Sequence, residues 1–314
     1  MEAVRIEFQE KVNLTKAIAT GNLVAFNGTC DREIIVAIAR KPLDYRHNGS
    51  SGASFAKSKT EQGQKYSIFY TVCNELIHLT DIANEVFNIH EVQFLSDRQI
   101  LLVCCRANYY GRDRFDRNGR IYSTSGEYQT GILLGDGIQN VRVSSKGTIW
   151  TSYFDEGIFG NRGWHTPVGM SGLVAWNADG EKIYEFSPVG EIAAISDCYA
   201  LNVETNNITW CYYYTDFPLV RIDRGCIDDY WYIPVYGSDC FAVYRNFALF
   251  RGGYKERNCF YLVKLGKNHR ATIEKRIQPV NIENIDRISS CGDTIFYLSA
   301  KKVYSISVYE AMYV

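Results

Sequence analysis

The sequence lacks the signals that mark secreted, membrane or nucleic-acid-binding proteins. Its net charge is −1, from 34 basic and 35 acidic residues that are intermixed, so it has no basic face to neutralise phosphates. No window approaches the ~18 apolar residues of a membrane-spanning helix. The first ten residues, MEAVRIEFQE, carry charges and have no apolar centre, unlike a secretory signal. We therefore expect a cytoplasmic protein that binds neither nucleic acid nor membrane.

Paired cysteines and local catalytic motifs are also missing. None of the ten cysteines forms a CxxC pair, and there is no GxSxG, HExxH or GxxxxGK[ST] sequence. Several cysteines lie in or beside expected strands, where a thiol packs as a small apolar side chain. This favours reduced core cysteines over disulfides or a metal cluster. The six cysteines concerned are Cys73, Cys104, Cys105, Cys198, Cys211 and Cys259.

The residues that are abundant are those of β-sheets. Only 3 Met and 6 Pro occur, against 23 Tyr and 16 Phe, and aromatic and β-branched side chains suit a pleated, half-buried surface. Short turns of Asn, Asp, Gly and Ser lead repeatedly into such runs, as expected for hairpins. The clearest examples are Val143–Phe154, Ala178–Phe186, Glu204–Tyr214 and Cys291–Ser299. The sequence predicts an all-β fold.

The apolar runs group into six sets of four, which is the strand number of a propeller blade. The sixth set is one run short, and Val4–Phe8 alternates apolar and charged residues as a strand does. We expect this N-terminal strand to complete the last blade, which removes an exposed sheet edge. The prediction is one six-bladed β-propeller over residues 1–314, with seven blades as the alternative. The six sets begin at Leu23, Glu91, Asn140, Ile192, Cys240 and Asp286.

Three hairpin phrases carry a resemblance to known proteins. They are DRNGRIYST from Asp116, SSKGTIWTS from Ser144 and GLVAWNADGEKIYEF from Gly172. They resemble repeat units of bacterial propellers of the NHL-repeat and gluconolactonase-like superfamily, which has six-bladed members. The resemblance is one of architecture, and architecture does not fix function.

The long loops of the expected propeller gather on one face. Loops between second and third strands lie on the same face as the connections between blades, which we call the upper face. Three such loops are long, namely Lys41–Lys65, Arg106–Gly119 and Asp155–Met170. Because long loops on a rigid scaffold commonly carry function, one half of the upper face is the predicted site.

Candidate binding residues lie in the second and third of these loops. Tyr110, Arg112 and Arg114 combine guanidinium groups with an aromatic ring, which suits carboxylates, phosphates or sugar rings. Trp164 offers a stacking platform, and His165 can act as acid, base or ligand. The alternative is that the Arg and Asp side chains pair locally and that His165 and Trp164 only support the loop.

Three carboxylates form a candidate metal site. Asp197 opens an expected inner strand, while Glu156 and Asp216 come from adjacent loops, and such oxygens suit a divalent cation, calcium first. The resemblance implies the same, since gluconolactonase-like propellers bind a metal through a Glu, an Asn and an Asp from different blades. The chain departs from them at Ala19–Gly28, where the expected glycine-flanked Glu is absent.

The sequence leaves three functions open. The first is a recognition module that binds a small molecule or a protein on the upper face without bond chemistry. The second is a metal-dependent, lactonase-like hydrolase in which His165 handles protons as the catalytic residue. The third is a structural scaffold.

Overall fold

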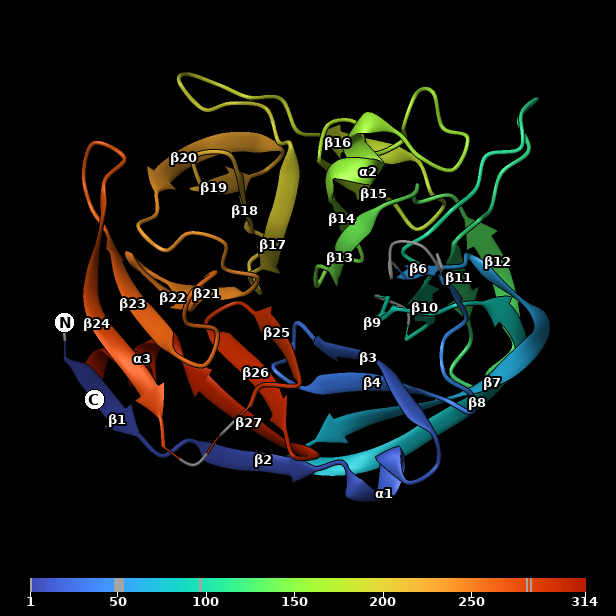
Figure 1. The fold of residues 1–314 in the computed structure, drawn as a ribbon, viewed down its shortest axis with the longest axis horizontal. Helices are drawn as coiled ribbons and strands as arrows, with labels where there is room; N and C mark the ends of the chain where they lie inside the picture. The colour runs from blue at the N-terminus through green and yellow to red at the C-terminus, as the bar shows by residue number, and fades with distance from the viewer. Residues whose placement is uncertain (1, 48–53, 96–97, 281, 283) are drawn as a thin grey trace.

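Six antiparallel sheets stand in a ring, each with its first strand towards the centre (Figure 1). This computed structural model describes residues 2–47, 54–95, 98–280, 282 and 284–314. Each sheet is one propeller blade, so the six-bladed prediction is confirmed and the seven-blade alternative is wrong.

The first three blades follow the expected runs in chain order. Blade one contains β3 (Asn22–Gly28), β4 (Ile34–Ala39), β7 (Lys59–Val72) and β8 (Glu75–Phe87). Blade two contains β9 (Glu91–Phe94), β10 (Ile100–Val103), β11 (Gly119–Tyr122) and β12 (Tyr128–Ile132). Blade three contains β13 (Ile138–Val143), β14 (Ile149–Tyr153), β15 (Leu173–Trp176) and β16 (Lys182–Glu185).

The remaining blades complete the ring. Blade four contains β17 (Asp197–Val203), β18 (Thr209–Tyr214), β19 (Pro218–Asp223) and β20 (Cys226–Tyr232). Blade five contains β21 (Phe241–Tyr244), β22 (Phe247–Arg251), β23 (Phe260–Leu265) and β24 (Ala271–Pro279). Blade six contains β25 (Arg287–Cys291), β26 (Thr294–Ser299) and β27 (Lys302–Ser307).

The N-terminal segment closes the ring, but the strand that completes blade six follows the predicted strand in the sequence. The outer strand of blade six is β2 (Gln9–Asn13), which pairs with β27. The predicted run forms β1 (Ala3–Ile6), which pairs in parallel with β24 and adds a fifth strand to blade five. Between them Phe8 packs against Phe260 and Tyr297, with ring centroids 5.8 and 5.6 Å away. The terminus therefore ties together two blades.

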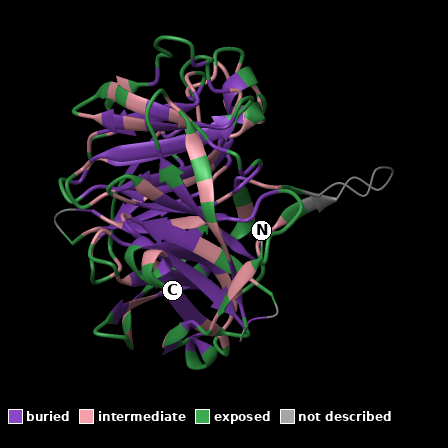
Figure 2. Cartoon of the chain, turned by 90° about the vertical axis from the view of Figure 1, so that its left-hand side faces the viewer, coloured by how far each residue is buried: buried purple, intermediate pink, exposed green. Residues whose placement is uncertain are grey.

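Burial explains why these segments form strands. Every residue of β4 is buried, because this second strand packs against both neighbouring blades, whereas β8 at the rim alternates exposed and buried positions. Figure 2 shows buried positions along the strands and exposed ones at the turns. One apolar cluster joins Ile35 of β4 to Ile100 of β10, so the core fills the spaces between blades.

Helices contribute little to the fold. The helices are short: α1 (Thr15–Ile18), α2 (Asp155–Phe159) and α3 (Val308–Tyr313). A hairpin of β5 (Tyr45–His47) and β6 (Ser54–Ala56) projects from the first long loop. No helix in the described ranges has the length and apolar character to cross a membrane.

All ten cysteines are free thiols. Four of the six predicted core cysteines are buried, namely Cys104, Cys198, Cys211 and Cys259. Cys105 is half-buried. Cys73 is exposed, because it lies in the turn between β7 and β8 with a left-handed φ of 51°.

Candidate functional site

The three long loops of the upper face contact one another. Tyr109, in the long loop of blade two, donates its N–H to the carbonyl of Arg162 in the long loop of blade three, at 3.0 Å. In the opposite direction, the indole N–H of Trp164 donates to the Ala107 carbonyl at 2.8 Å. The rings of Tyr109 and Trp164 lie 4.9 Å apart. Arg162 also donates through Nη2 to the carbonyl of Ala56, in the loop of blade one. We call residues 104–118 and 154–172 together the loop wall.

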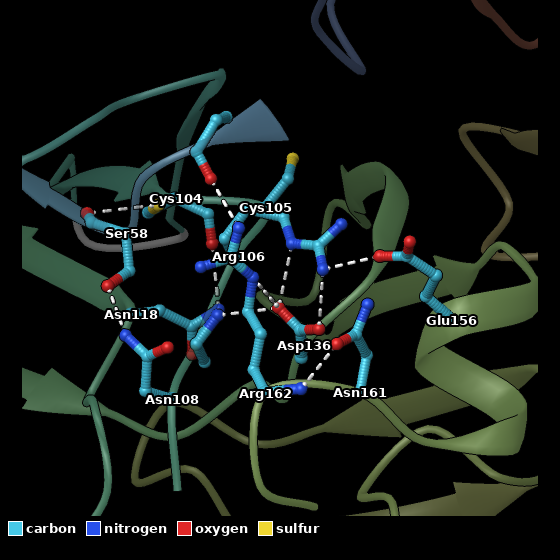
Figure 3. A network of polar contacts seen from close by, with 12 residues as sticks. Ser58, Cys104, Cys105, Arg106, Asn108, Asn118, Asp136, Glu156, Asn161 and Arg162 are labelled. Atoms are coloured by element: carbon cyan, nitrogen blue, oxygen red, sulfur yellow. Dashed lines mark hydrogen bonds and ion pairs between the residues drawn. The ribbon is translucent and has the colours of Figure 1, made fainter. Parts of the chain in front are cut away.

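A buried ion pair lies at the base of the loop wall (Figure 3). Arg106 Nε and Nη2 lie 2.9 Å from Oδ1 and Oδ2 of Asp136, and the two side chains are 9% and 3% exposed. The Ala107 N–H also donates to Asp136, at 2.8 Å. Arg106 Nη2 further contacts the Glu156 carboxylate at 2.5 Å, and Arg162 Nε lies 3.6 Å from Asp136. This cluster joins blade two to blade three.

Burial opposes the charges of this cluster. Burial raises the pKa of Asp136, although the positive charge of Arg106 favours the ionised carboxylate. It also lowers the pKa of Arg162, which the neighbouring Arg106 charge reinforces. The ion pair therefore depends on both partners being present, since either charge alone would be costly in this setting.

Two titratable groups towards the centre of the ring, His90 and Glu91, were not among the predicted site residues. His90 accepts the Cys105 N–H through Nδ1 at 3.2 Å, and burial lowers its pKa to about 4, so it is neutral at pH 7. Glu91 accepts from the Asn27 amide at 2.6 Å and lies 3.9 Å from Arg142. Burial raises the pKa of Glu91 to about 6. No motif marks either residue, because their setting comes from several blades.

The predicted binding residues divide into two groups. Trp164 is held between the loops, and the Tyr110 hydroxyl donates to Asp116 at 3.1 Å, so both serve the loop structure. Arg112, Arg114 and His165 are exposed. Arg114 Nη2 donates to the Tyr110 carbonyl at 3.5 Å.

The predicted metal ligands have separate settings. Glu156 is engaged with Arg106, and Asp216 is exposed in the turn between β18 and β19. Asp197, the first residue of β17, is half-buried, and burial and then the charge of Asp155 raise its pKa to about 6. Within the described ranges, no group of three or more His, Cys, Asp or Glu is placed to hold a metal ion.

An aromatic cluster lies on the upper ends of blades four and five, which the sequence interpretation passed over. Its centre is Phe217, which is 6% exposed and has a left-handed φ of 54°. Such a backbone is uncommon for a bulky residue and persists only where the surroundings enforce it. Five tyrosine rings lie within 5.4–6.1 Å of it, those of Tyr199, Tyr212, Tyr214, Tyr236 and Tyr254.

Comparisons with known proteins find distant similarities and give no activity. No curated protein matches the chain. Among solved structures, it is similar to a chain of the mitotic checkpoint complex (9% identity, TM-score 0.49, 98% of this chain and 90% of that one). It is also similar to a gluconolactonase from Xanthomonas campestris (9% identity, TM-score 0.43, 89% of this chain and 91% of that one). A PQQ-bound aldose sugar dehydrogenase from Streptomyces coelicolor is similar as well (8% identity, TM-score 0.47, 96% of this chain and 97% of that one). Residues 173–305, less than half of the chain, match the model of the YxzG family.

Proposed function

We propose that this protein is a recognition module whose loop wall binds an anionic group, a carboxylate or a phosphate, through Arg112 and Arg114. The observation that carries the proposal is the interlocking of the loops through Arg162 and Trp164. Loops fixed in this way present the side chains at their tip in a preset arrangement, and preorganisation lowers the ordering cost of binding.

The charges of the blade-two loop support an anionic ligand. Its buried acid, Asp116, is already paired with Lys59 at 2.5 Å and accepts the Asn108 N–H at 2.9 Å. In the described part of the chain, neither Arg112 nor Arg114 forms an ion pair. Guanidinium groups bind carboxylates and phosphates through paired hydrogen bonds. The loop tip thus offers two arginines against the single acid Asp113 between them.

The contacts of Glu156 favour recognition over the hydrolase alternative. To bind a cation, this carboxylate would have to give up its contact with Arg106. Arg106 is 9% exposed, and among the described residues Asp136 would then be its remaining acidic partner. Breaking a buried charge cluster costs several kcal/mol. Recognition by the exposed arginines leaves the cluster intact.

The test is a titration of the protein with inorganic phosphate and with succinate. Tryptophan fluorescence detects binding, since Trp164 lies within the loop wall. The double variant Arg112→Ala/Arg114→Ala should bind about tenfold or more weakly, as expected for lost charge-assisted hydrogen bonds. Lys146→Ala, which removes a charge from an exposed turn on the opposite face, is the matched control. The proposal would be refuted if the double variant bound the anions as tightly as wild type, or if wild-type protein bound neither anion.

A further inference from the structure

Three aromatic rings on the upper face of blades four and five stand nearly at right angles to one another. The Tyr199 and Tyr254 rings make angles of 78° and 77° with the Phe217 ring, at centroid distances of 5.6 and 6.1 Å. The angle between Tyr199 and Tyr254 is 84°, at 6.1 Å. We call these three residues the aromatic corner.

The corner is fixed from several directions. The hydroxyl groups of Tyr199 and Tyr254 share a hydrogen bond of 2.6 Å. Tyr212 stacks on the Phe217 ring at 5.4 Å, and its own hydroxyl donates to the Val235 carbonyl. Tyr199 lies at a register shift between β17 and β18, which has no partner for it in the ladder. A β-bulge of this kind redirects a side chain and is common next to binding sites.

The tyrosines around the corner are open to solvent. Tyr214, Tyr236 and Tyr254 are 43%, 60% and 54% exposed, so their rings form an accessible aromatic surface. Beneath them Phe217 is buried in the core, and Tyr199 packs against that core. Exposed aromatic surface gathered in one place indicates an interaction site. Tyr236 and Tyr254 also line a cavity of about 400 Å³ that extends towards Tyr261.

Carboxylates without cationic partners adjoin this surface. Asp197 is directly opposite Tyr214 in the β17–β18 ladder, and Asp155 lies near enough for its charge to disfavour ionisation of Asp197. The charge of Asp197 in turn contributes, after burial and the Tyr254 contact, to a raised pKa of Tyr199. Among the described residues, Asp155, Asp197 and Asp216 form no ion pair. The surface thus combines ring faces with uncompensated negative charge.

We infer that the exposed rings at the aromatic corner, Tyr214, Tyr236 and Tyr254, bind an organic cation together with Asp197. The cation is an ammonium group, preferably a methylated one. Ring faces attract cations through their quadrupole, most strongly where several rings replace the water around a weakly hydrated group. Asp197 supplies the counter-charge, and the cation relieves its repulsion with Asp155. This site is separate from Arg112 and Arg114 and does not rest on the anion proposed for the loop wall.

The first experiment compares choline with 3,3-dimethylbutan-1-ol, which has the same shape and no charge. Binding is followed by NMR line broadening of the ligand at pH 7.5, with equal ionic strength maintained by sodium chloride. Choline should bind saturably and at least tenfold more tightly than the alcohol. Equal binding of the two would show an apolar patch and overturn the inference, as would the absence of saturable choline binding.

Variants place the binding at the corner. Tyr254→Leu and Asp197→Asn should each weaken choline binding about tenfold, whereas Tyr254→Phe retains the ring and should stay within about threefold of wild type. Tyr309→Leu removes a tyrosine of α3 that is 52% exposed and serves as the matched control. Near-UV circular dichroism confirms that each variant is folded. A folded Tyr254→Leu protein with wild-type affinity would overturn the inference.

The source of the cation is resolved by a second titration. A short peptide containing trimethyllysine is compared with choline and with the same peptide containing norleucine. Binding of the trimethyllysine peptide more tightly than choline supports a protein partner, and equal affinity supports a free amine. Both results retain the cation site, while equal binding of the norleucine peptide counts against it. Loss of anion binding in the Arg112→Ala/Arg114→Ala protein leaves all these outcomes unchanged.

Discussion

Replacing Arg106 by methionine should destabilise the protein by about 3–5 kcal/mol, the usual cost of removing one partner from a buried ion pair. The variant leaves Asp136, which is 3% exposed, with the Ala107 N–H at 2.8 Å and Arg162 no nearer than 3.6 Å. Burial already raises the pKa of Asp136. Without Arg106 it rises further, so the folded variant takes up a proton that the unfolded chain does not hold. The difference in free energy of unfolding between wild type and Arg106→Met should therefore become smaller as pH falls from 7 to 5.

The double variant Arg106→Met/Asp136→Leu separates charge from packing. It removes both charges and keeps similar volume, so it should recover to within about 2 kcal/mol of wild type. Urea unfolding followed by tryptophan fluorescence, compared at equal m-values, measures each difference. Arg112→Met, at an exposed position, is the control and should change stability by less than about 0.5 kcal/mol. A single Arg106→Met variant within about 1 kcal/mol of wild type would refute the reasoning.

Four further results are expected. Phe8→Ala should lower the free energy of unfolding in urea by about 3–5 kcal/mol, because it opens a cavity between blades five and six. A chain lacking residues 1–14 should aggregate in size-exclusion chromatography, and normal elution would contradict ring closure by the N-terminal segment. Lys275→Met removes the 2.7 Å hydrogen bond to the Met312 carbonyl, so the amides of α3 should exchange with deuterium faster while those of β4 do not change. Burial and the charge of Asp155 raise the pKa of Asp197 from its ordinary 3.8 to about 6, so wild type loses stability as pH rises from 4 to 6. Asp197→Asn should therefore be more stable than wild type by about 1 kcal/mol at pH 7, after allowance for solvent screening, and equally stable at pH 3.5. The same difference at both pH values would contradict this cause.

The blades were predictable from the sequence because each strand carries its own local signal. Runs such as Ile34–Ala39 and Ile149–Tyr153 are bounded by turn residues and are long enough to cross one blade. The closing strand was less predictable. Val4–Phe8 alternates better than the following QEKVN segment, yet QEKVN pairs with β27. The place of QEKVN depends on where Phe8 is buried, against Phe260 and Tyr297, which lie more than 250 residues further along the chain.

The candidate site was less predictable because its contacts join distant loops. The sequence shows that Arg106, Trp164 and Glu156 lie in long loops, but their partners Asp136 and Ala107 are unremarkable in sequence. The aromatic corner is similar in this respect. Phe217 lies in a short TDFP turn, whereas Tyr199 and Tyr254 reach it from β17 and from blade five.

The two halves of the upper face differ because long and short loops are stabilised differently. The long loops of blades two and three lie outside the blade ladders, so they are ordered by buried polar pairs such as Arg106–Asp136 and by rings held in place such as Trp164. Those residues are then unavailable to a ligand, and only the tip remains free. The short turn at Phe217 is held by the ladder of β18 and β19, and five tyrosines surround it. The tyrosines left at its surface are therefore free to bind, so the loop-poor half of the ring is as strong a candidate for recognition as the loop-rich half.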